Sequence, residues 1–150
     1  MATYSFLSVT ATFTGMTGFV DLSFGASIAK EGITVTPGGS RNTMLPGADG
    51  EVMHSLKADK SGQVTVRLLK TSPANKKLMA MFNAQQISAS AWGNNVIMIQ
   101  QRDSNDTITC RSVAFTNMPT ITFAEEGGLM EWVFDCGKID GILGEYPTGE

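Results

Sequence analysis

The residues best suited to chemistry in this sequence are its single histidine, His54, and its two cysteines, Cys110 and Cys136. Histidine is the commonest general base, and a hydrolase needs that base beside a nucleophile and an orienting group. The sequence has no G-x-S-x-G elbow, and no glycine-rich stretch continues into the Gly-Lys-Ser or Gly-Lys-Thr of a phosphate-binding loop. A hydrolase that uses His54 is therefore a minor hypothesis.

The spacing of possible ligands also argues against a metal site. A structural zinc site needs four ligands, whereas the histidine and the two cysteines are three and lie scattered along the chain. The segments 49–51 and 103–106 contain acidic residues but lack the spacing of a calcium loop. We expect no metal and no cofactor. Cys110 and Cys136 are interpreted as small buried apolar residues, with a disulfide or a reactive thiol as the alternative.

The overall composition is typical of a globular chain that forms one domain, residues 1–150. Charged residues make up 17% of the chain, below the usual quarter or so, which predicts that partners cover part of the surface. Lys and Arg number 11 against 14 Asp and Glu, a net charge of −3 without a basic run, so a surface that clamps nucleic acid is not expected. Neither a membrane-spanning run nor a signal peptide is recognisable, and we expect the chain to be made in a cytoplasm.

Alternation of apolar and polar residues predicts strands through most of the chain. Leu7 to Phe13 and Val20 to Phe24 form an expected hairpin around the turn 15–18. Further strands are expected at Ile33–Thr36, Val64–Leu68, Asn95–Gln101, Thr107–Phe115, Thr120–Phe123 and Met130–Cys136, with a hairpin turn at Glu125–Gly128 before the last and a loose tail from Tyr146 to Glu150. The sequence thus predicts a mainly β sandwich or partly closed barrel.

One helix, at about 72–86, is expected to flank the sheet. Ser72 is suited to the N-cap and Pro73 to the first helical position. Leu78, Met79 and Phe82 share a stripe that we expect to pack on the sheet rather than on a cofactor.

The segment at about 37–62 is a long inter-strand loop that contains apolar side chains in a glycine-rich setting. A loop of more than about a dozen residues is usually functional or disordered. Burying one of its apolar side chains against a partner contributes about 1.5–3 kcal/mol, which favours an arm that docks on a neighbour. A lid over its own core is the alternative. The candidate contact residues are Arg41, Met44, Leu45, Pro46, Asp49, Glu51, Val52, Met53, His54 and Leu56.

Several runs of the sequence resemble the tail tube protein of contractile-tailed bacteriophages. These runs are HSLKADKSGQVTVRLLKTSP from His54 to Pro73, ITCR from Ile108 to Arg111, EWVFD from Glu131 to Asp135 and KIDG from Lys138 to Gly141. The resemblance extends over nearly the whole chain, and similar tubes occur in type VI secretion systems and contractile bacteriocins. It implies a tail-tube-type β-sandwich whose long loop, here residues 38–60, reaches onto an adjacent subunit or ring.

The resemblance also implies a structural protein rather than an enzyme. Hexameric rings would stack into the hollow inner tube of a contractile tail, the conduit for DNA ejection into the host. The implied partners are the tail sheath protein, the baseplate or tail initiator and the tape measure protein. Phage DNA would pass transiently and without specificity, and the subunit itself would not insert into a membrane. The implied location is the virion tail, after assembly in the host bacterial cytoplasm.

The face of the sheet that lines the lumen is expected to be polar and not basic, because lysines facing phosphate would hold the DNA. Alternation alone makes Gln63, Thr65, Glu131 and Asp135 the candidates for that face, and the alternative is that this polar face meets the sheath or the helix. The main competing hypothesis is a β-barrel that binds a small ligand and uses the long loop as a lid.

Overall fold

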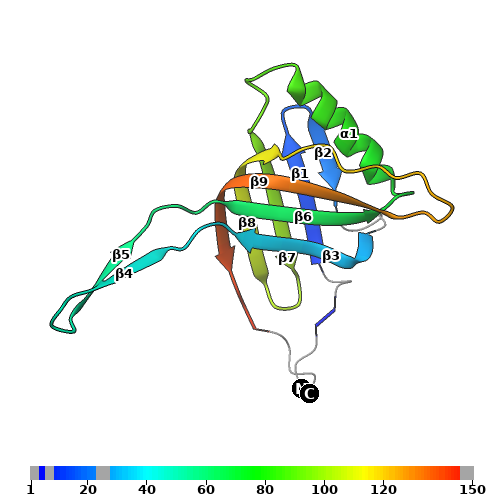
Figure 1. Cartoon of the computed structure of the whole chain (residues 1–150). Coiled ribbons are helices and arrows are strands. Elements are labelled where there is room, and N and C mark those ends of the chain that lie inside the picture. The colour runs from blue at the N-terminus through cyan, green and yellow to red at the C-terminus, as the bar shows by residue number, and fades with distance from the viewer. Residues whose placement is uncertain (1–3, 6–8, 23–27, 146–150) are drawn as a thin grey trace.

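The computed structural model describes residues 4–5, 9–22 and 28–145, and in this part of the chain it contains nine strands and one helix (Figure 1). The expected strand positions Leu7 and Phe24 and the expected loose tail from Tyr146 lie outside the described residues. None of the described helices is both long enough and apolar enough to span a membrane.

The described strands form a seven-stranded antiparallel sheet and a separate two-stranded sheet. The large sheet has the order β2-β1-β7-β8-β9-β6-β3. Its strands are β1 (Val9–Gly15), β2 (Gly18–Asp21), β3 (Ile28–Pro37), β6 (Gly62–Leu69), β7 (Asn95–Gln101), β8 (Asp106–Phe115) and β9 (Leu129–Ile142). The small sheet pairs β4 (Asn42–Pro46) with β5 (Val52–Leu56).

The long strand β9 turns the large sheet into a sandwich-like arrangement. Its first part, 129–136, pairs with β6, and its second part, 134–142, pairs with β8. The strands β3 and β6 therefore cross β1, β7 and β8 in front of them in Figure 1. A bulge in β8, with Ser112 at φ 54°, adds local bending beside this corner. The sheet does not close into a barrel, because β2 and β3 end the described strand order.

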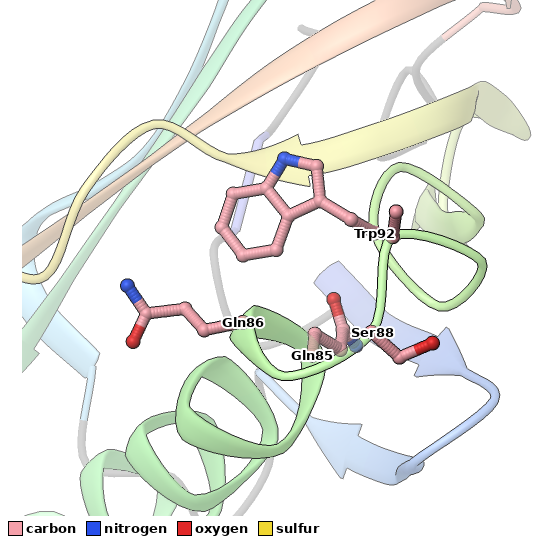
Figure 2. A pocket seen from close by; sticks show the side chains of 5 residues that line it. Gln85, Gln86, Ser88 and Trp92 are labelled. Carbon is pink, nitrogen blue, oxygen red and sulfur yellow. The ribbon is translucent and has the colours of Figure 1, made fainter.

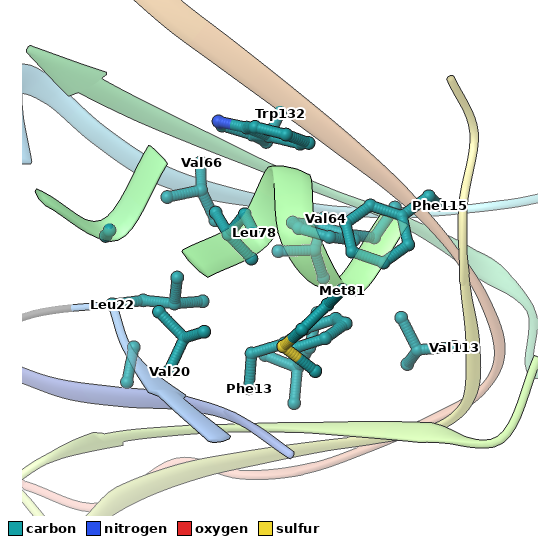
Figure 3. Packing of buried hydrophobic residues seen from close by; sticks show 14 of the residues in the cluster. Phe13, Val20, Leu22, Val64, Val66, Leu78, Met81, Val113, Phe115 and Trp132 are labelled. Carbon is teal, nitrogen blue, oxygen red and sulfur yellow. The ribbon is translucent and has the colours of Figure 1, made fainter. Parts of the chain in front are cut away.

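The core lies between the two layers and is rich in aromatic side chains (Figure 3). The ring of Phe115 is central, with centroids 5.2–5.9 Å from those of Phe13, Phe82, Trp132 and Phe134. Alternate residues of β1, β6 and β9 point into this core, as the alternation predicted. The expectation of a mainly β, sandwich-like fold is confirmed.

The helix α1 (Pro73–Gln86) begins at the residue that its sequence predicted. Ser72 is the N-cap, and its hydroxyl accepts a hydrogen bond from the Ala74 amide at 3.3 Å. Leu78 and Phe82 are buried, and Met79 is partly buried against the same core.

A buried amide pair joins the end of α1 to the sheet. Gln85 Nε2 donates to Asn95 Oδ1 at 2.8 Å, and Asn95 Nδ2 donates to Gln85 Oε1 at 2.9 Å. Asn95 Nδ2 also donates to the Val113 carbonyl, and Gln85 Nε2 to Thr17 Oγ1. A Cβ at Gly15 would lie 2.0 Å from Asn95 Oδ1, so only glycine leaves room for this pair. The spacing of polar residues in the sequence gives no sign of this network.

The predicted strand at Thr120–Phe123 and the predicted hairpin turn at Glu125–Gly128 are wrong. Residues 116–128 form one long connection from β8 to β9, without an assigned strand. The alternating pattern is present, but the described chain provides no strand partner for it. The strands around Ile33–Thr36 and Met130–Cys136 are also longer than expected, as β3 and β9 show.

Candidate assembly surface

The long inter-strand segment between β3 and β6 is a β-hairpin that projects from the body, and we call residues 38–60 the arm (Figure 1). The arm strands β4 and β5 pair in register from Asn42–Leu56 to Pro46–Val52. The structure thus adds two strands to a segment that the sequence indicated only as a loop. The arm residues are exposed throughout.

The turn at the tip of the arm is fixed by local hydrogen bonds. The Gly47 amide donates to the Glu51 carbonyl at 2.6 Å, and the Glu51 amide donates to Asp49 Oδ1 at 3.1 Å. Gly50 has a φ of +90°, a conformation that side chains with a Cβ rarely adopt. Asp49, Gly50 and Glu51 therefore build a turn.

The base of the arm is closed by main-chain bonds. The Gly38 amide donates to the Ser61 carbonyl at 2.8 Å, and the Lys57 amide donates to the Arg41 carbonyl at 2.9 Å. Asp59 Oδ1 accepts from the Ser61 amide at 2.9 Å. Hydrogen bonds from the Ser61 side chain and amide lower the pKa of Asp59, with Arg41 and Lys57 nearby adding a smaller effect.

The pairing of β4 with β5 places apolar side chains on both faces of the arm. Residues directly opposite in an antiparallel pair share a face, and neighbours along a strand alternate. Leu45 and Met53 therefore share one face and are 61% and 56% exposed. The other face carries Met44 and Pro46 from β4 and Val52, His54 and Leu56 from β5. A ribbon that is apolar on both faces is suited to burial between protein surfaces.

The structure places the four lumen candidates together on the outer face of β6 and β9. Gln63 is opposite Asp135 in the register, and its amide donates to Asp135 Oδ1 at 2.9 Å. Thr65 lies two residues along β6, and Glu131 is ion-paired with Arg67 at 3.4 Å. Arg67 is ion-paired with Glu131, so these five residues present amide, hydroxyl and carboxylate groups and no unpaired cation.

The chemistry-bearing residues of the sequence are not gathered into a reactive site. His54 Nδ1 lies 3.1 Å from Asn42 Nδ2 on the exposed arm. Cys110 and Cys136 are free and buried, and the hydrogen bond between their thiols together with burial raises the pKa of Cys136. In the part of the chain that the structure describes, no group of three or more His, Cys, Asp or Glu side chains could hold a metal ion.

Two cavities in the body are the places where the ligand-binding hypothesis would put a ligand. One, of about 340 Å³, lies at the end of α1 and is lined by Gln85, Gln86, Ser88, Ala89 and Trp92 (Figure 2). The other, of about 200 Å³, lies between the layers and includes Ile33, Val35, Ile99 and Ile108 in its apolar lining. The arm extends away from the body, so it does not act as a lid on either cavity in this structure (Figure 1).

Comparison with known families supports the structural hypothesis. Residues 1–144 match the family described as the bacteriophage PhiTE tail tube protein. The chain belongs to this tail tube family. Membership supports a structural role related to the tail tube and a place in the virion tail. No individually curated protein matches the sequence.

Solved structures of contractile injection systems share the fold of this tail tube family member. The cap of the anti-feeding prophage, a tube-terminating cap, has a TM-score of 0.57 at 10% identity, with 95% of this chain and 93% of that chain covered. The PVC sheath/tube terminator in its extended state has a TM-score of 0.61 at 11% identity, with 95% of this chain and 98% of that chain covered. The PVC sheath–tube complex in its extended state has a TM-score of 0.51 at 13% identity, with 77% of this chain and 91% of that chain covered. At these identities the likeness concerns the fold alone.

Sequence reasoning missed two features of this tail tube chain that bear on assembly. The hairpin strands of the arm were missed because turn residues flank them and because their apolar residues are consecutive, as in Met44 with Leu45 and Val52 with Met53, and do not alternate with polar ones. Within the connection at 116–128 the sequence predicted a strand at Thr120–Phe123, whereas the structure leaves this segment at the surface with an exposed Phe123.

Proposed function

We propose that this protein is the tail tube subunit of a contractile-tailed phage and forms hexameric rings that stack into a hollow tube inside the sheath. The arm is the observation that carries the proposal. It presents apolar side chains on both faces and has no partner for them in its own described chain. Each such side chain contributes about 1.5–3 kcal/mol when a partner buries it.

The open edges of the large sheet support ring formation. β2 and β3 end the described strand order, and β3 extends over ten residues. An exposed edge strand offers unpaired main-chain groups, which favours pairing with another chain. Closing six subunits into a ring would remove these edges.

The polar face of β6 and β9 is proposed to line the lumen. Gln63, Thr65, Glu131 and Asp135 would present few groups that attract phosphate, and Arg67 is already paired with Glu131. DNA could then pass without being retained. The mechanism is assembly and conduction, without a catalytic step or a cofactor. Rings would stack from a tail initiator in the host cytoplasm around the tape measure protein.

The test is negative-stain electron microscopy of the concentrated protein and of a variant with Met44→Asp and Leu45→Asp. We expect hollow rings or tubes from the natural sequence and dispersed particles from the variant. A matched control, Ser88→Asp with Ser90→Asp, adds the same charge at an exposed site outside the arm and should assemble normally. A natural chain that stays monomeric at high concentration, even with a tail initiator added, would contradict the proposal.

A further inference from the structure

A second exposed apolar group lies at the end of the body opposite the arm. The connection from β8 to β9, residues 116–128, runs out to that end, and we call it the strap (Figure 1). Phe123 on the strap is 88% exposed. Leu69 and Leu129, opposite each other in the register of β6 and β9, are also exposed there. We define the end patch as Leu69, Phe123, Glu125, Glu126 and Leu129.

Contacts from Lys70 hold the strap and its aromatic ring in place. Lys70 Nζ lies 4.2 Å from the centroid of the Phe123 ring and donates to the Thr122 carbonyl. The Lys70 amide also donates to the Gly128 carbonyl at 3.2 Å. An exposed apolar side chain that is already positioned loses little freedom when a partner covers it, which favours binding.

A groove of about 530 Å³ runs between the strap and β9. Over residues 129–132 β9 pairs with β6 alone, and its other edge has no strand beside it in the described chain. The Val133 carbonyl accepts from the Thr116 amide at the inner end of the groove. By the two-residue repeat of a strand, the main-chain groups of Leu129 and Glu131 point to the same side. The groove therefore offers an unpaired strand edge, and its lining mixes apolar side chains such as Met118 and Leu129 with polar ones such as Asn117.

We infer that the end patch and its groove receive the arm of a second copy of this chain. The inference rests on the proposed tube function and names the surface that the arm binds. Both arm strands have a free edge that can pair with the free edge of β9 in the groove, and the apolar faces of the arm can cover the exposed Leu69, Phe123 and Leu129. Arg41 and Lys57 at the base of the arm are opposite in charge to Glu125 and Glu126.

The positions of the two surfaces exclude the subunit's own arm as the occupant. The arm projects from one end of the body, and the strap lies at the other (Figure 1). Contact between different patches on two copies is head-to-tail, and such contacts propagate into rings or filaments. An arm-to-end-patch contact thus links successive copies in one direction.

Cysteine cross-linking between two differently tagged subunits tests this inference. One subunit carries Ser55→Cys on the arm, and the other carries Ala124→Cys on the strap; the natural cysteines are buried. A short bis-maleimide should join the two tags in a mixed sample. A strap partner replaced by Thr14→Cys, on the exposed face of β1, is the matched control and should give no product above background.

The outcomes separate this inference from the proposed function when the same samples are viewed by electron microscopy. Rings or tubes without the Ser55–Ala124 product would overturn the end patch as the receptor and leave the tube function standing. The product without rings or tubes would support the contact and overturn the tube. Absence of both at high concentration, even with a tail initiator added, would overturn both.

A charge exchange gives a second test that does not depend on the cross-linker. Glu125→Lys with Glu126→Lys, or Arg41→Glu with Lys57→Glu, should each weaken association on the order of tenfold at low salt. All four substitutions in one chain should restore association towards that of the natural protein. If the variant with all four substitutions associates no better than the double variants, the pairing of these charges is overturned.

Discussion

In the body, Val64, Val66 and Leu68 of β6 point inward and are fully buried, whereas Leu45 and Met53 of the arm are paired just as regularly and stay more than half exposed. Both regions consist of regularly paired antiparallel strands, but the strands of the body are apolar on one face, whereas those of the arm carry apolar residues on both faces. The difference is that the second layer of the body covers one set, and the described chain offers nothing to cover the other. A strand pattern therefore predicts that a surface is to be buried, but not which chain buries it.

The largest loss of stability that separates the two regions is expected from Phe115→Ala in the body. The ring of Phe115 contacts four other aromatic rings of the core within 6 Å, so its removal should lower the free energy of unfolding by about 3–5 kcal/mol. Urea unfolding of the monomer measures this. Leu45→Ala on the arm is the matched control and should change the free energy of unfolding by less than about 0.5 kcal/mol. Equal losses from the two substitutions would mean that the arm is part of the core.

The next largest effect is expected from Asn95→Leu in the buried amide pair. The substitution leaves Gln85 Oε1 and the Val113 carbonyl without the donor that Asn95 supplies, which should cost about 1–3 kcal/mol of the free energy of unfolding. Thermal and urea unfolding would measure it. The same change at the exposed neighbour, Asn94→Leu, should have a much smaller effect. Similar values at both positions would show that the pair does not stabilise the body.

A smaller effect on monomer stability, with a large one on assembly, is expected from Met44→Asp with Leu45→Asp. The monomer should keep its free energy of unfolding within about 0.5 kcal/mol, since both side chains are already exposed. Sedimentation velocity should nevertheless show loss of the assembled species. Normal assembly of the variant would show that the arm is not part of the interface. Unfolding of the variant would show that the arm, like the body, stabilises the monomer.

The smallest effect is expected at the base of the arm, where Asp59 accepts from the Ser61 amide. Because the pKa of Asp59 is lowered in the fold, its stabilising contribution is present above its ordinary pKa of 3.8 and is lost as the pH falls through the lower, folded value. The Ser61 amide chemical shift should follow this titration with a midpoint below 3.8. Asp59→Asn should abolish the transition. A midpoint at or above the ordinary value would show that the bond does not form in solution.

The sequence predicted the parts of the fold that one chain completes by itself. The helix from Ser72 was predictable because its cap, its proline and its apolar stripe are all local. The strands that contain Val64 and Trp132 were predictable because their buried residues repeat every two positions. The amide pair of Gln85 and Asn95 was not predictable, since polar residues give no sign of burial until their partner is placed.

The candidate assembly surface was only partly predictable, for a related reason. The arm residues from Arg41 to Leu56 were identified by their apolar content, yet their pairing into β4 and β5 was obscured by the flanking turn residues. The strap gave the opposite error, because Thr120 to Phe123 alternate like a strand while the described chain leaves them unpaired. The local pattern of apolar and polar residues cannot distinguish a strand that pairs within the subunit from a segment that has no strand partner there.

The most direct test of the arm's role is sedimentation velocity of the natural chain beside one in which residues 39–60 are replaced by Asn-Gly. The deletion is closed by a two-residue turn, because Gly38 and Ser61 are already hydrogen-bonded at 2.8 Å. We predict that the natural chain forms large species whose amount rises with concentration, and that the armless chain stays monomeric with unchanged thermal stability. Equal assembly of the two chains would contradict the claim that a second copy completes the arm.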